Sequence, residues 1–262
     1  MSTYPPPPAT ARAPGHDFGA WVCYDRGMRS WLTILLLLLG ALPTLAAEAA
    51  ERRLYGFSED GDWFAFAEYG THDGTGAPYA TLYILDVVND RWAPGTPVKV
   101  SFGERPGPPA AALRRAEAKA APLFARYGIA GYGMLLASRA ARQIGDRHRL
   151  AFRPPPSASA PPRAAVTLRE IDVPDPPRCR RWGIDEKGFA LSFSRDGAAL
   201  GEIYRDRRVP ASRLCPARYE LADVVYHAPP SSRPRYVIIV RYFRMGFEGL
   251  DGRYLAVPTF LH

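Results

Sequence analysis

The chain has 262 residues, of which 47% are hydrophobic and 12% aromatic, and it carries a formal net charge of +8. A hydrophobic fraction of this size is typical of a globular protein and excludes a chain that is disordered throughout. Arginine supplies nearly all of the positive charge, but acidic residues stand close to it, as in "LRRAEAK" and "IYRDRRV". Because the excess is scattered along the chain, it indicates a solvated surface and argues against a nucleic-acid-binding protein.

The segment that begins at Met28 has the three parts of a secretory signal. A basic residue is followed by an apolar run from Trp31 to Leu45 and then by small residues. The apolar run is shorter than the roughly 20 residues that a membrane-spanning helix needs. We therefore expect residues 28–49 to be a signal peptide that is cleaved after Ala49, which leaves no transmembrane anchor. Residues 1–27 are then an extension upstream of the true start.

The cysteines agree with export. Cys23 precedes the signal, which leaves Cys179 and Cys215 in the exported chain. An even number of cysteines in an oxidising compartment predicts a disulfide. Two free thiols or a metal pair are the alternatives, but neither cysteine stands in a CxxC motif or beside a histidine. We predict a Cys179–Cys215 disulfide, no metal site and no cofactor.

The first part of the exported chain predicts strands. "GFSEDGDWFAFAEYG", residues 56–70, indicates two strands joined by a turn at Asp60-Gly61, and "YATLYILDVVNDRW" indicates a strand covered on both faces. Alternation along the second strand of the hairpin places Trp63 and Tyr69 on one face, and Phe64 and Phe66 on the other. Either both faces are covered, or one is an exposed aromatic platform for a glycan or a protein partner.

One helical insertion is predicted at residues 108–127. Prolines suit its first turn, and Gly128 suits the position that follows its end. Apolar residues recur on one face of this helix, and Pro122 is expected to kink or split it. The residues on that face are Leu113, Ala116, Ala120, Phe124 and Tyr127.

The second part of the exported chain also predicts strands. A Pro-rich segment at residues 153–163 is either a long surface loop or a linker between two domains, and we favour the loop. Six strand-like segments follow it, with turn residues between most of them and a hairpin loop at "PPSSRP". Residues 50–262 are therefore predicted to form a single secreted β-rich domain.

Three stretches place Asp-Gly between apolar segments, which is a strong hairpin signal. They are "FSEDGDWFAFAEY", "FSRDGAALGEIYR" and "GLDGRYLAV", and they resemble the hairpins of TolB-like and WD40-like propeller blades. Propeller blades recur about every 40–50 residues, whereas these stretches are unevenly spaced. The predicted fold class is mainly β, with antiparallel sheets arranged as a sandwich, and partial propeller-like hairpins are the alternative.

The chain as a whole is similar to a known family. "YGFSEDGDWFAFAEYGTHDGTGAPYATLYILDVVNDRWAPGTPV", "PLFARYGI" and "GFEGLDGRYLAVP" resemble an uncharacterised family of bacterial predicted secreted proteins, a domain of unknown function. The resemblance covers nearly all of the exported chain. It implies export and a shared domain, and it implies no activity and no catalytic residues.

Two glycine-rich stretches, "EYGTHDGTGAPY" and "GFEGLDG", are predicted surface loops and candidate walls of a ligand site. Each combines glycine with an acid and an aromatic residue, although the glycines can also serve turn geometry alone. A carboxylate pair for glycoside hydrolysis can come from the same stretches. The candidate binding residues are Glu68, Tyr69, Asp73, Tyr79, Phe247, Glu248 and Asp251.

The sequence shows no G-x-S-x-G or HExxH motif, so we assign no catalytic residues. We expect an exported, non-catalytic binding or envelope-associated module, periplasmic or secreted, whose partner is an envelope protein or an anionic glycan. The alternatives are a periplasmic hydrolase of envelope glycans or peptides and a truncated propeller-like scaffold. A deep cleft with paired carboxylates favours the hydrolase, and a flat aromatic or arginine-rich face favours binding.

Overall fold

A computed structural model of the chain describes residues 50–103, 105–140, 145–153, 164–173, 177–247 and 249–260. The predicted extension and signal peptide, most of the Pro-rich segment and Glu248 lie outside the described residues. The described residues all belong to one compact unit.

The strands form three antiparallel sheets. The first sheet has the order β4-β3-β2-β1-β6, with β5 paired to β3; its strands are β1 (Glu51–Ser58), β2 (Trp63–Thr71), β3 (Pro78–Asp86), β4 (Arg91–Trp92), β5 (Val98–Ser101) and β6 (Ile129–Tyr132). The middle sheet has the order β14-β13-β12-β7; its strands are β7 (Met134–Ser138), β12 (Pro216–His227), β13 (Arg235–Met245) and β14 (Leu250–Thr259). The third sheet has the order β11-β10-β9-β8; its strands are β8 (Arg149–Phe152), β9 (Ala164–Asp172), β10 (Lys187–Arg195) and β11 (Ala198–Arg205). The helices are α2 (Pro109–Arg126), α3 (Pro177–Arg181) and the 3₁₀ helix η1 (Ala211–Arg213).

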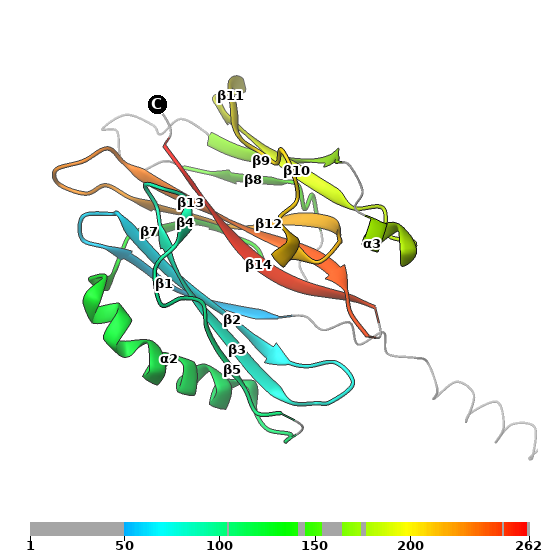
Figure 1. Cartoon of the computed structure of the whole chain (residues 1–262). Coiled ribbons are helices and arrows are strands. Elements are labelled where there is room, and N and C mark those ends of the chain that lie inside the picture. Colours follow the sequence, from blue (N-terminus) through cyan, green and yellow to red (C-terminus); the bar gives the residue numbers. More distant parts are fainter. Residues whose placement is uncertain are drawn as a thin grey trace, which may run out of the picture. The chain divides into compact units, whose positions relative to one another are not determined.

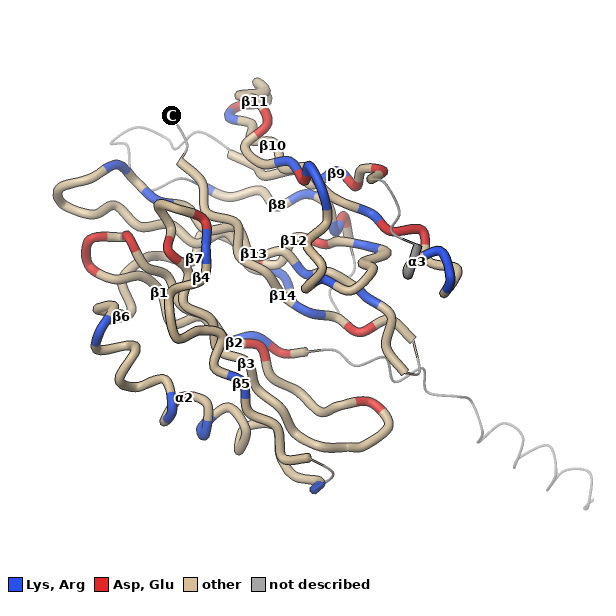
Figure 2. The backbone as a smooth tube through the Cα atoms, in the orientation of Figure 1, with Lys and Arg blue, Asp and Glu red and all other residues tan. Residues whose placement is uncertain are grey.

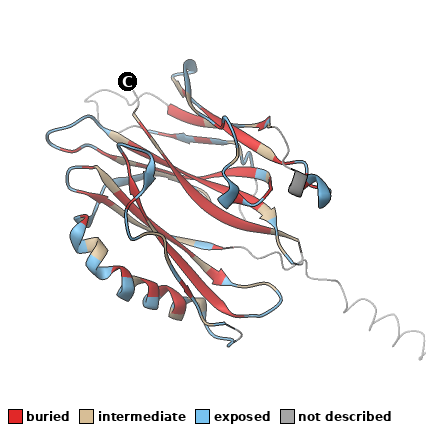
Figure 3. Ribbon diagram, viewed as in Figure 1, coloured by how far each residue is buried: buried red, intermediate tan, exposed pale blue. Residues whose placement is uncertain are grey.

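The sheets are stacked in layers, with α2 on the outer face of the first sheet (Figure 1). The middle sheet is covered on both faces because β13 carries an unbroken apolar run. Its Val237 and Ile239 pack against the first sheet, whereas Ile238 and Val240 pack against the third. Figure 3 shows the resulting band of buried residues through β12, β13 and β14. This stack confirms the mainly β, sandwich-like class and is not an arrangement of blades around an axis.

Both faces of β2 are covered, so the exposed aromatic platform on this strand is a wrong alternative. Phe64 and Phe66 are buried against the middle sheet. Trp63 and Tyr69 lie on the opposite face, in the cluster that packs beneath α2. The predicted alternation is therefore right, and each of its two faces has a different covering layer.

Two of the three Asp-Gly hairpins are confirmed. A turn at Asp60-Gly61 joins β1 to β2, and a turn at Asp196-Gly197 joins β10 to β11. The third is wrong, since Asp251 and Gly252 lie inside β14, and Gly246, Phe247 and Gly249 precede that strand. Gly252 is opposite Phe243, so the ladder with β13 runs through the dipeptide.

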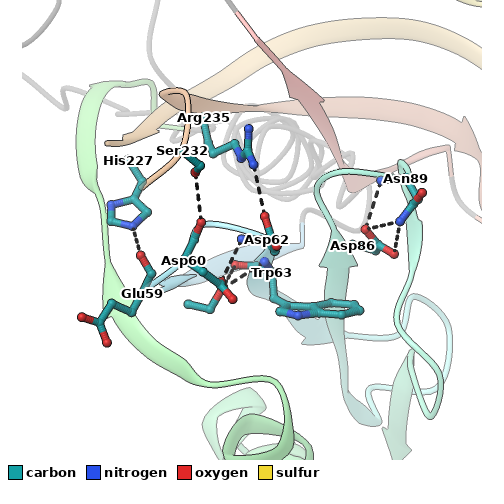
Figure 4. Close-up of polar contacts among 10 residues, drawn as sticks. Glu59, Asp60, Asp62, Trp63, Asp86, Asn89, His227, Ser232 and Arg235 are labelled. Atoms are coloured by element: carbon teal, nitrogen blue, oxygen red, sulfur yellow. Dashed lines mark hydrogen bonds and ion pairs between the residues drawn. The ribbon is translucent and has the colours of Figure 1, made fainter. Parts of the chain in front are cut away.

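The turn at the end of the β1–β2 hairpin is fixed against the β12–β13 hairpin (Figure 4). The Nε2 atom of His227 lies 2.8 Å from the carbonyl oxygen of Glu59. Arg235 donates from Nη2 to Oδ1 of Asp62 at 3.1 Å. These contacts join the first sheet to the middle sheet, so the opening hairpin of the chain has a structural role at this end of the stack.

The predicted helical insertion is confirmed as α2, whose buried residues include Leu113, Ala116 and Ala120. Gly128 follows the helix with φ +60°, a conformation that glycine adopts without strain. Pro122 lies inside the helix, and the helix continues through it without being split. The packed face on the first sheet therefore outweighs the lost backbone hydrogen bond.

The strands on either side of the Pro-rich segment pair with each other. Phe152 of β8 is opposite Ala164 of β9 in an antiparallel ladder. The two strands that flank the segment are therefore neighbours in one sheet, and its loop character stays a prediction because most of it lies outside the described residues. The expected hairpin loop at residues 229–234 is confirmed, because it connects β12 to β13.

Candidate functional site

A pocket of about 780 Å³ lies beside β14, the edge strand of the middle sheet. Three parts of the fold line it: β2 to β5 of the first sheet, β13 and β14 of the middle sheet, and the segment from β11 to η1. Pockets of about 300–1,000 Å³ are typical of small-molecule sites. We therefore take this pocket as the candidate site.

The first-sheet wall follows from strand alternation. Thr81, Tyr83 and Leu85 are alternate residues of β3 and line the pocket together. The neighbouring strands add residues directly opposite them: Lys99 of β5 faces Thr81, and Trp92 of β4 faces Leu85. This wall therefore offers aromatic rings, a hydroxyl and a cation on one surface.

The aromatic rings of this wall support one another. Tyr83 stacks on Phe66 with a centroid distance of 4.9 Å and an interplanar angle of 14°. The indole of Trp92 lies 4.9 Å from Tyr83 and 6.3 Å from Phe66, yet it remains 38% exposed. Trp92 thus packs on half-buried Tyr83 and buried Phe66, and it lines the pocket with part of its ring exposed.

Glu68 is a buried carboxyl at the base of the pocket and is 4% exposed. Its Oε1 accepts a hydrogen bond from the hydroxyl of Tyr83 at 3.0 Å, and its Oε2 accepts one from the backbone N–H of Tyr254 at 2.9 Å. Burial raises the pKa of Glu68, while these hydrogen bonds and the charges of Arg253 and Arg244 act in the opposite direction. Glu68 is therefore fixed between β2 and β14.

The middle-sheet wall carries two arginines on one face. Tyr242 is opposite Arg253, and Arg244 is opposite Asp251, so all four side chains share a face of the β13–β14 pair. Arg253 pairs with Asp251 at 3.5 Å, donates to the hydroxyl of Tyr79 and lies over the Tyr79 ring, 4.6 Å from its centroid. Arg253 thus bridges the middle sheet and the first sheet at the pocket.

Arg244 and Lys99 differ from the other cations of the pocket. Arg244 is half-buried and Lys99 is exposed. Neither side chain has an ion pair or a hydrogen bond with any residue that the structure describes. Two cations from two different sheets therefore line one pocket with no direct bond to an acid among these residues, although the charge of Arg244 acts on the buried carboxyl of Glu68.

The third wall is held by a buried ion pair. Arg213 of η1 donates from Nη1 to Oδ2 of Asp206 at 2.6 Å and from Nη2 to the hydroxyl of Tyr204 at 3.1 Å. Its guanidinium lies over the Phe189 ring, 5.1 Å from the centroid. Burial raises the pKa of Tyr204 to about 12, so this tyrosine stays protonated at neutral pH. The wall is therefore rigid and partly cationic.

The predicted disulfide stabilises the same wall. Cys215, two residues after Arg213, is bonded to Cys179, and both cysteines are fully buried. The bond connects the end of η1 to α3. The disulfide prediction is confirmed, and the bond secures the segment that carries Arg213.

The lining of the pocket has more basic than acidic residues. Figure 2 shows the basic and acidic positions along these strands. The basic residues of the lining are Arg91, Lys99, Arg213, Arg244 and Arg253, and the acidic ones are Glu68 and Asp90. The pocket is therefore suited to a ligand with negative charge.

The chain matches a family model described as "Predicted secreted protein (DUF2259)" over residues 65–259. The chain belongs to this family. Every residue that lines the pocket lies within the matched range. No curated protein and no solved structure gave a significant match.

Membership of the DUF2259 family confirms the export prediction in its general form, a predicted secreted protein. None of the described helices has the length and apolar character that crossing a membrane requires. Cleavage after Ala49 and a periplasmic location stay predictions.

The structure places two of the predicted site residues in the pocket of this DUF2259 protein, namely Glu68 and Tyr79. Asp251 does not line the pocket but pairs with Arg253, which does. Tyr69 lies on the other face of β2, where its hydroxyl donates to Glu51 at 2.7 Å. Because side chains alternate along β2, Tyr69 points away from the pocket although it follows Glu68 in the sequence.

The two predicted surface loops are shorter than expected. The described loop residues are 72–77 in the first stretch and Gly246, Phe247 and Gly249 in the second, whereas Glu68, Tyr79 and Asp251 are buried in strands. The loops do lie together, because a Cβ atom on Gly74 would stand 3.2 Å from the Phe247 ring. Phe247 is 83% exposed and, like Asp73, does not line the pocket. Glu248 lies outside the described residues.

Several residues of the pocket were missed by the sequence analysis, chiefly Trp92, Lys99, Arg213, Arg244 and Arg253. One signal was available for two of them. "RYVIIVRYFRM" and "LDGRYLAVP" place arginine within strands that are otherwise apolar. A charged residue in a doubly covered strand needs a polar site or a partner.

Proposed function

We propose that this secreted protein is a binding protein that takes an anionic ligand into the pocket beside β14. The observation that carries the proposal is the pair of cations, Arg244 and Lys99, on two walls of one pocket, neither of them in an ion pair or a hydrogen bond with a described residue. A half-buried guanidinium that makes no hydrogen bond to an acid gains a charge-assisted one when an anion arrives. An anionic glycan of the cell envelope fits this requirement.

The location that we propose is the periplasm or the external medium. The signal-like segment at residues 28–49 and the Cys179–Cys215 disulfide support it, since disulfides persist in oxidising compartments. There the ligand would reach the pocket without crossing the inner membrane.

Calorimetric titration of the purified protein tests the proposal. The probes are citrate, inorganic phosphate and galacturonate, at low and high salt. We expect Arg244→Gln combined with Lys99→Gln to weaken binding by at least about tenfold, since two charge-assisted contacts are lost. Arg114→Gln, an exposed arginine on α2, is the matched control. Absence of binding by the unaltered protein, or equal binding by the double variant and the control, contradicts the proposal.

A hydrolase is the second candidate. It is favoured by the pocket itself and by two carboxyls that line it, Glu68 and Asp90. A raised pKa, as burial gives Glu68, is what a general acid requires. Both oxygens of Glu68 already accept hydrogen bonds from Tyr83 and Tyr254, which leaves little of the carboxyl for a substrate.

Release of reducing ends or peptides from envelope glycans and peptidoglycan tests the hydrolase candidate. Turnover that is lost in both Glu68→Gln and Asp90→Asn would establish it. Saturable binding without turnover favours the binding protein.

A further inference from the structure

We infer that the ligand is an acidic saccharide, with a sugar ring packed on Trp92 and an acid group bound by Arg244 and Lys99. This inference rests on the proposed function and names the chemical class of the ligand. It is argued from the exposed indole, the hydroxyl groups of the lining and the size of the pocket.

Trp92 has the features of a stacking surface. Tyr83 and Phe66 pack behind its indole, and Tyr83 is itself held by its hydrogen bond to Glu68. The ring is therefore ordered before a ligand arrives, so binding to it costs little conformational entropy. The C–H face of a pyranose packs on such a ring, while its hydroxyl groups stay free to bond elsewhere.

The lining is also rich in hydroxyl groups. A hydroxyl both donates and accepts a hydrogen bond, as the hydroxyl groups of a sugar do. A simple anion, in contrast, needs only hydrogen-bond donors from the protein. The hydroxyl-bearing residues of the lining are Tyr79, Thr81, Tyr83, Ser101, Tyr204, Ser212, Tyr242 and Tyr254. Tyr83 and Tyr204 already donate to Glu68 and Asp206, and Tyr79 accepts from Arg253. The other hydroxyl groups match a polyhydroxylated ligand better than they match a simple anion.

The tyrosines near the arginines are protonated at neutral pH. Burial raises the pKa of Tyr242 to about 12, as it does for Tyr204. The hydroxyl of Tyr204 already donates to Oδ1 of Asp206 at 2.6 Å. The neutral hydroxyl of Tyr242 can donate to an acid group of the ligand without adding negative charge to the site.

The size of the pocket excludes a small anion as its full occupant. A water molecule takes up about 30 Å³ in the liquid, so a phosphate or sulfate would leave most of the 780 Å³ to solvent. A ligand with one or a few sugar units fills the space between Trp92 on the first sheet and Arg244 on the middle sheet.

Calorimetric titration with matched ligands and variants tests the inference. The acidic saccharides are trigalacturonate, a heparin disaccharide and glucose 1-phosphate, which carry carboxylate, sulfate and phosphate groups. Maltotriose is the neutral saccharide, citrate and inorganic phosphate are the non-sugar anions, and uridine monophosphate represents nucleotides. Circular dichroism and thermal unfolding confirm that each variant is folded.

We expect at least one acidic saccharide to bind at least about tenfold more tightly than maltotriose and citrate. Trp92→Ala should weaken its binding by about tenfold, as the loss of an aromatic contact does, and leave citrate binding unchanged. Arg244→Gln should weaken the binding of both the acidic saccharide and citrate. Trp182→Ala is the matched control, because Trp182 is exposed and does not line the pocket.

The outcomes separate this inference from the proposed function. If citrate and the saccharides bind equally and Trp92→Ala has no effect on binding, the inference of a saccharide ligand is wrong, and the proposed anion binding is still supported. If uridine monophosphate binds most tightly, the inference of a saccharide ligand is also wrong, and the ligand class is a nucleotide. If no anion of the panel binds, both the inference and the proposed function are wrong.

Discussion

Glu68 on β2 accepts a hydrogen bond from the backbone N–H of Tyr254 on β14, with 2.9 Å between Oε2 and the nitrogen. The outward N–H groups of an edge strand usually bond to water or to another chain. Here the N–H of Tyr254 bonds to a side chain from a different sheet. The same carboxyl accepts the hydroxyl of Tyr83. One residue therefore joins two sheets and supports the aromatic wall of the pocket.

The first prediction concerns Glu68 and pH. Burial raises its pKa above the ordinary value of 4.5, so the folded protein binds this proton more tightly than the unfolded chain does. The resulting stability is fully present below the ordinary pKa and is lost as pH rises through the folded value. Glu68→Gln resembles the protonated form at every pH. Its melting temperature relative to the unaltered protein should therefore rise as pH is raised above the ordinary pKa of 4.5.

Glu202→Gln is the control for this series, with the opposite sign. A hydrogen bond from Arg205 lowers the pKa of Glu202, so its stability is present above the ordinary pKa and is lost on acidification. The melting temperature of Glu202→Gln relative to the unaltered protein should therefore fall as pH rises. Melting curves by circular dichroism give both differences, and a constant difference for Glu68→Gln would contradict the prediction.

The second prediction concerns the ion pair between Arg52 of β1 and Asp223 of β12. Arg52 donates from Nη2 to Oδ1 at 2.7 Å, and the Asp223 side chain is 1% exposed. Arg52→Ala leaves a buried charge without its partner, which typically costs about 3–5 kcal/mol. Urea unfolding measures the loss.

A double variant distinguishes the lost partner from lost packing. Arg52→Met with Asp223→Leu removes both charges and should recover most of the stability. The exposed pair of Arg205 and Glu202 provides the comparison, and its removal should change stability little. A double variant as unstable as Arg52→Ala would show that packing dominates at this position.

The third prediction concerns the disulfide. Cys179 and Cys215 are 36 residues apart, and in the chain-entropy model a loop of this length stabilises the fold by about 3–4 kcal/mol. Replacing both cysteines by alanine should lower the melting temperature. It should also weaken anion binding, because the bond secures the segment that carries Arg213. Non-reducing peptide maps should recover the linked peptide, and full thiol labelling of the native protein would count against it.

The fourth prediction concerns the mature amino terminus. Cleavage after Ala49 leaves Ala50 as the first residue, immediately before β1. Its backbone N–H donates to the carbonyl oxygen of Gly252, which fixes the start of the described chain against β14. Mass spectrometry of the exported protein should find an amino terminus within a few residues of Ala50. An intact Met1, or retention in the cytoplasm, would refute cleavage.

Local signals predicted much of the fold. The Asp60-Gly61 turn and the apolar face of α2 are determined by neighbours in sequence, and both were found. The Asp-Gly at Asp251 was misread because its pairing with β13 is not a local property. The stacking of three sheets was also beyond the sequence pattern, since Val237 and Ile238 look alike until two different sheets cover them.

The site was predicted only in part for the same reason. Glu68 and Tyr79 belong to one glycine-rich stretch, so the sequence marked them together. Arg244 and Lys99 meet in the pocket from strands far apart in the chain, and no local pattern relates them. Tyr69 follows Glu68 in the sequence but does not line the pocket, because side chains alternate along β2.

The pairing of β7 and β8 has a consequence for cooperativity. Both strands precede the Pro-rich segment, yet β7 completes the middle sheet beside β12, and β8 completes the third sheet beside β9. The residues before the Pro-rich segment and those after it therefore cannot each form a complete hydrophobic core alone. Thermal unfolding should be one transition, with equal calorimetric and van't Hoff enthalpies. Fragments 50–153 and 164–260 should stay unfolded when expressed apart and regain structure only when mixed.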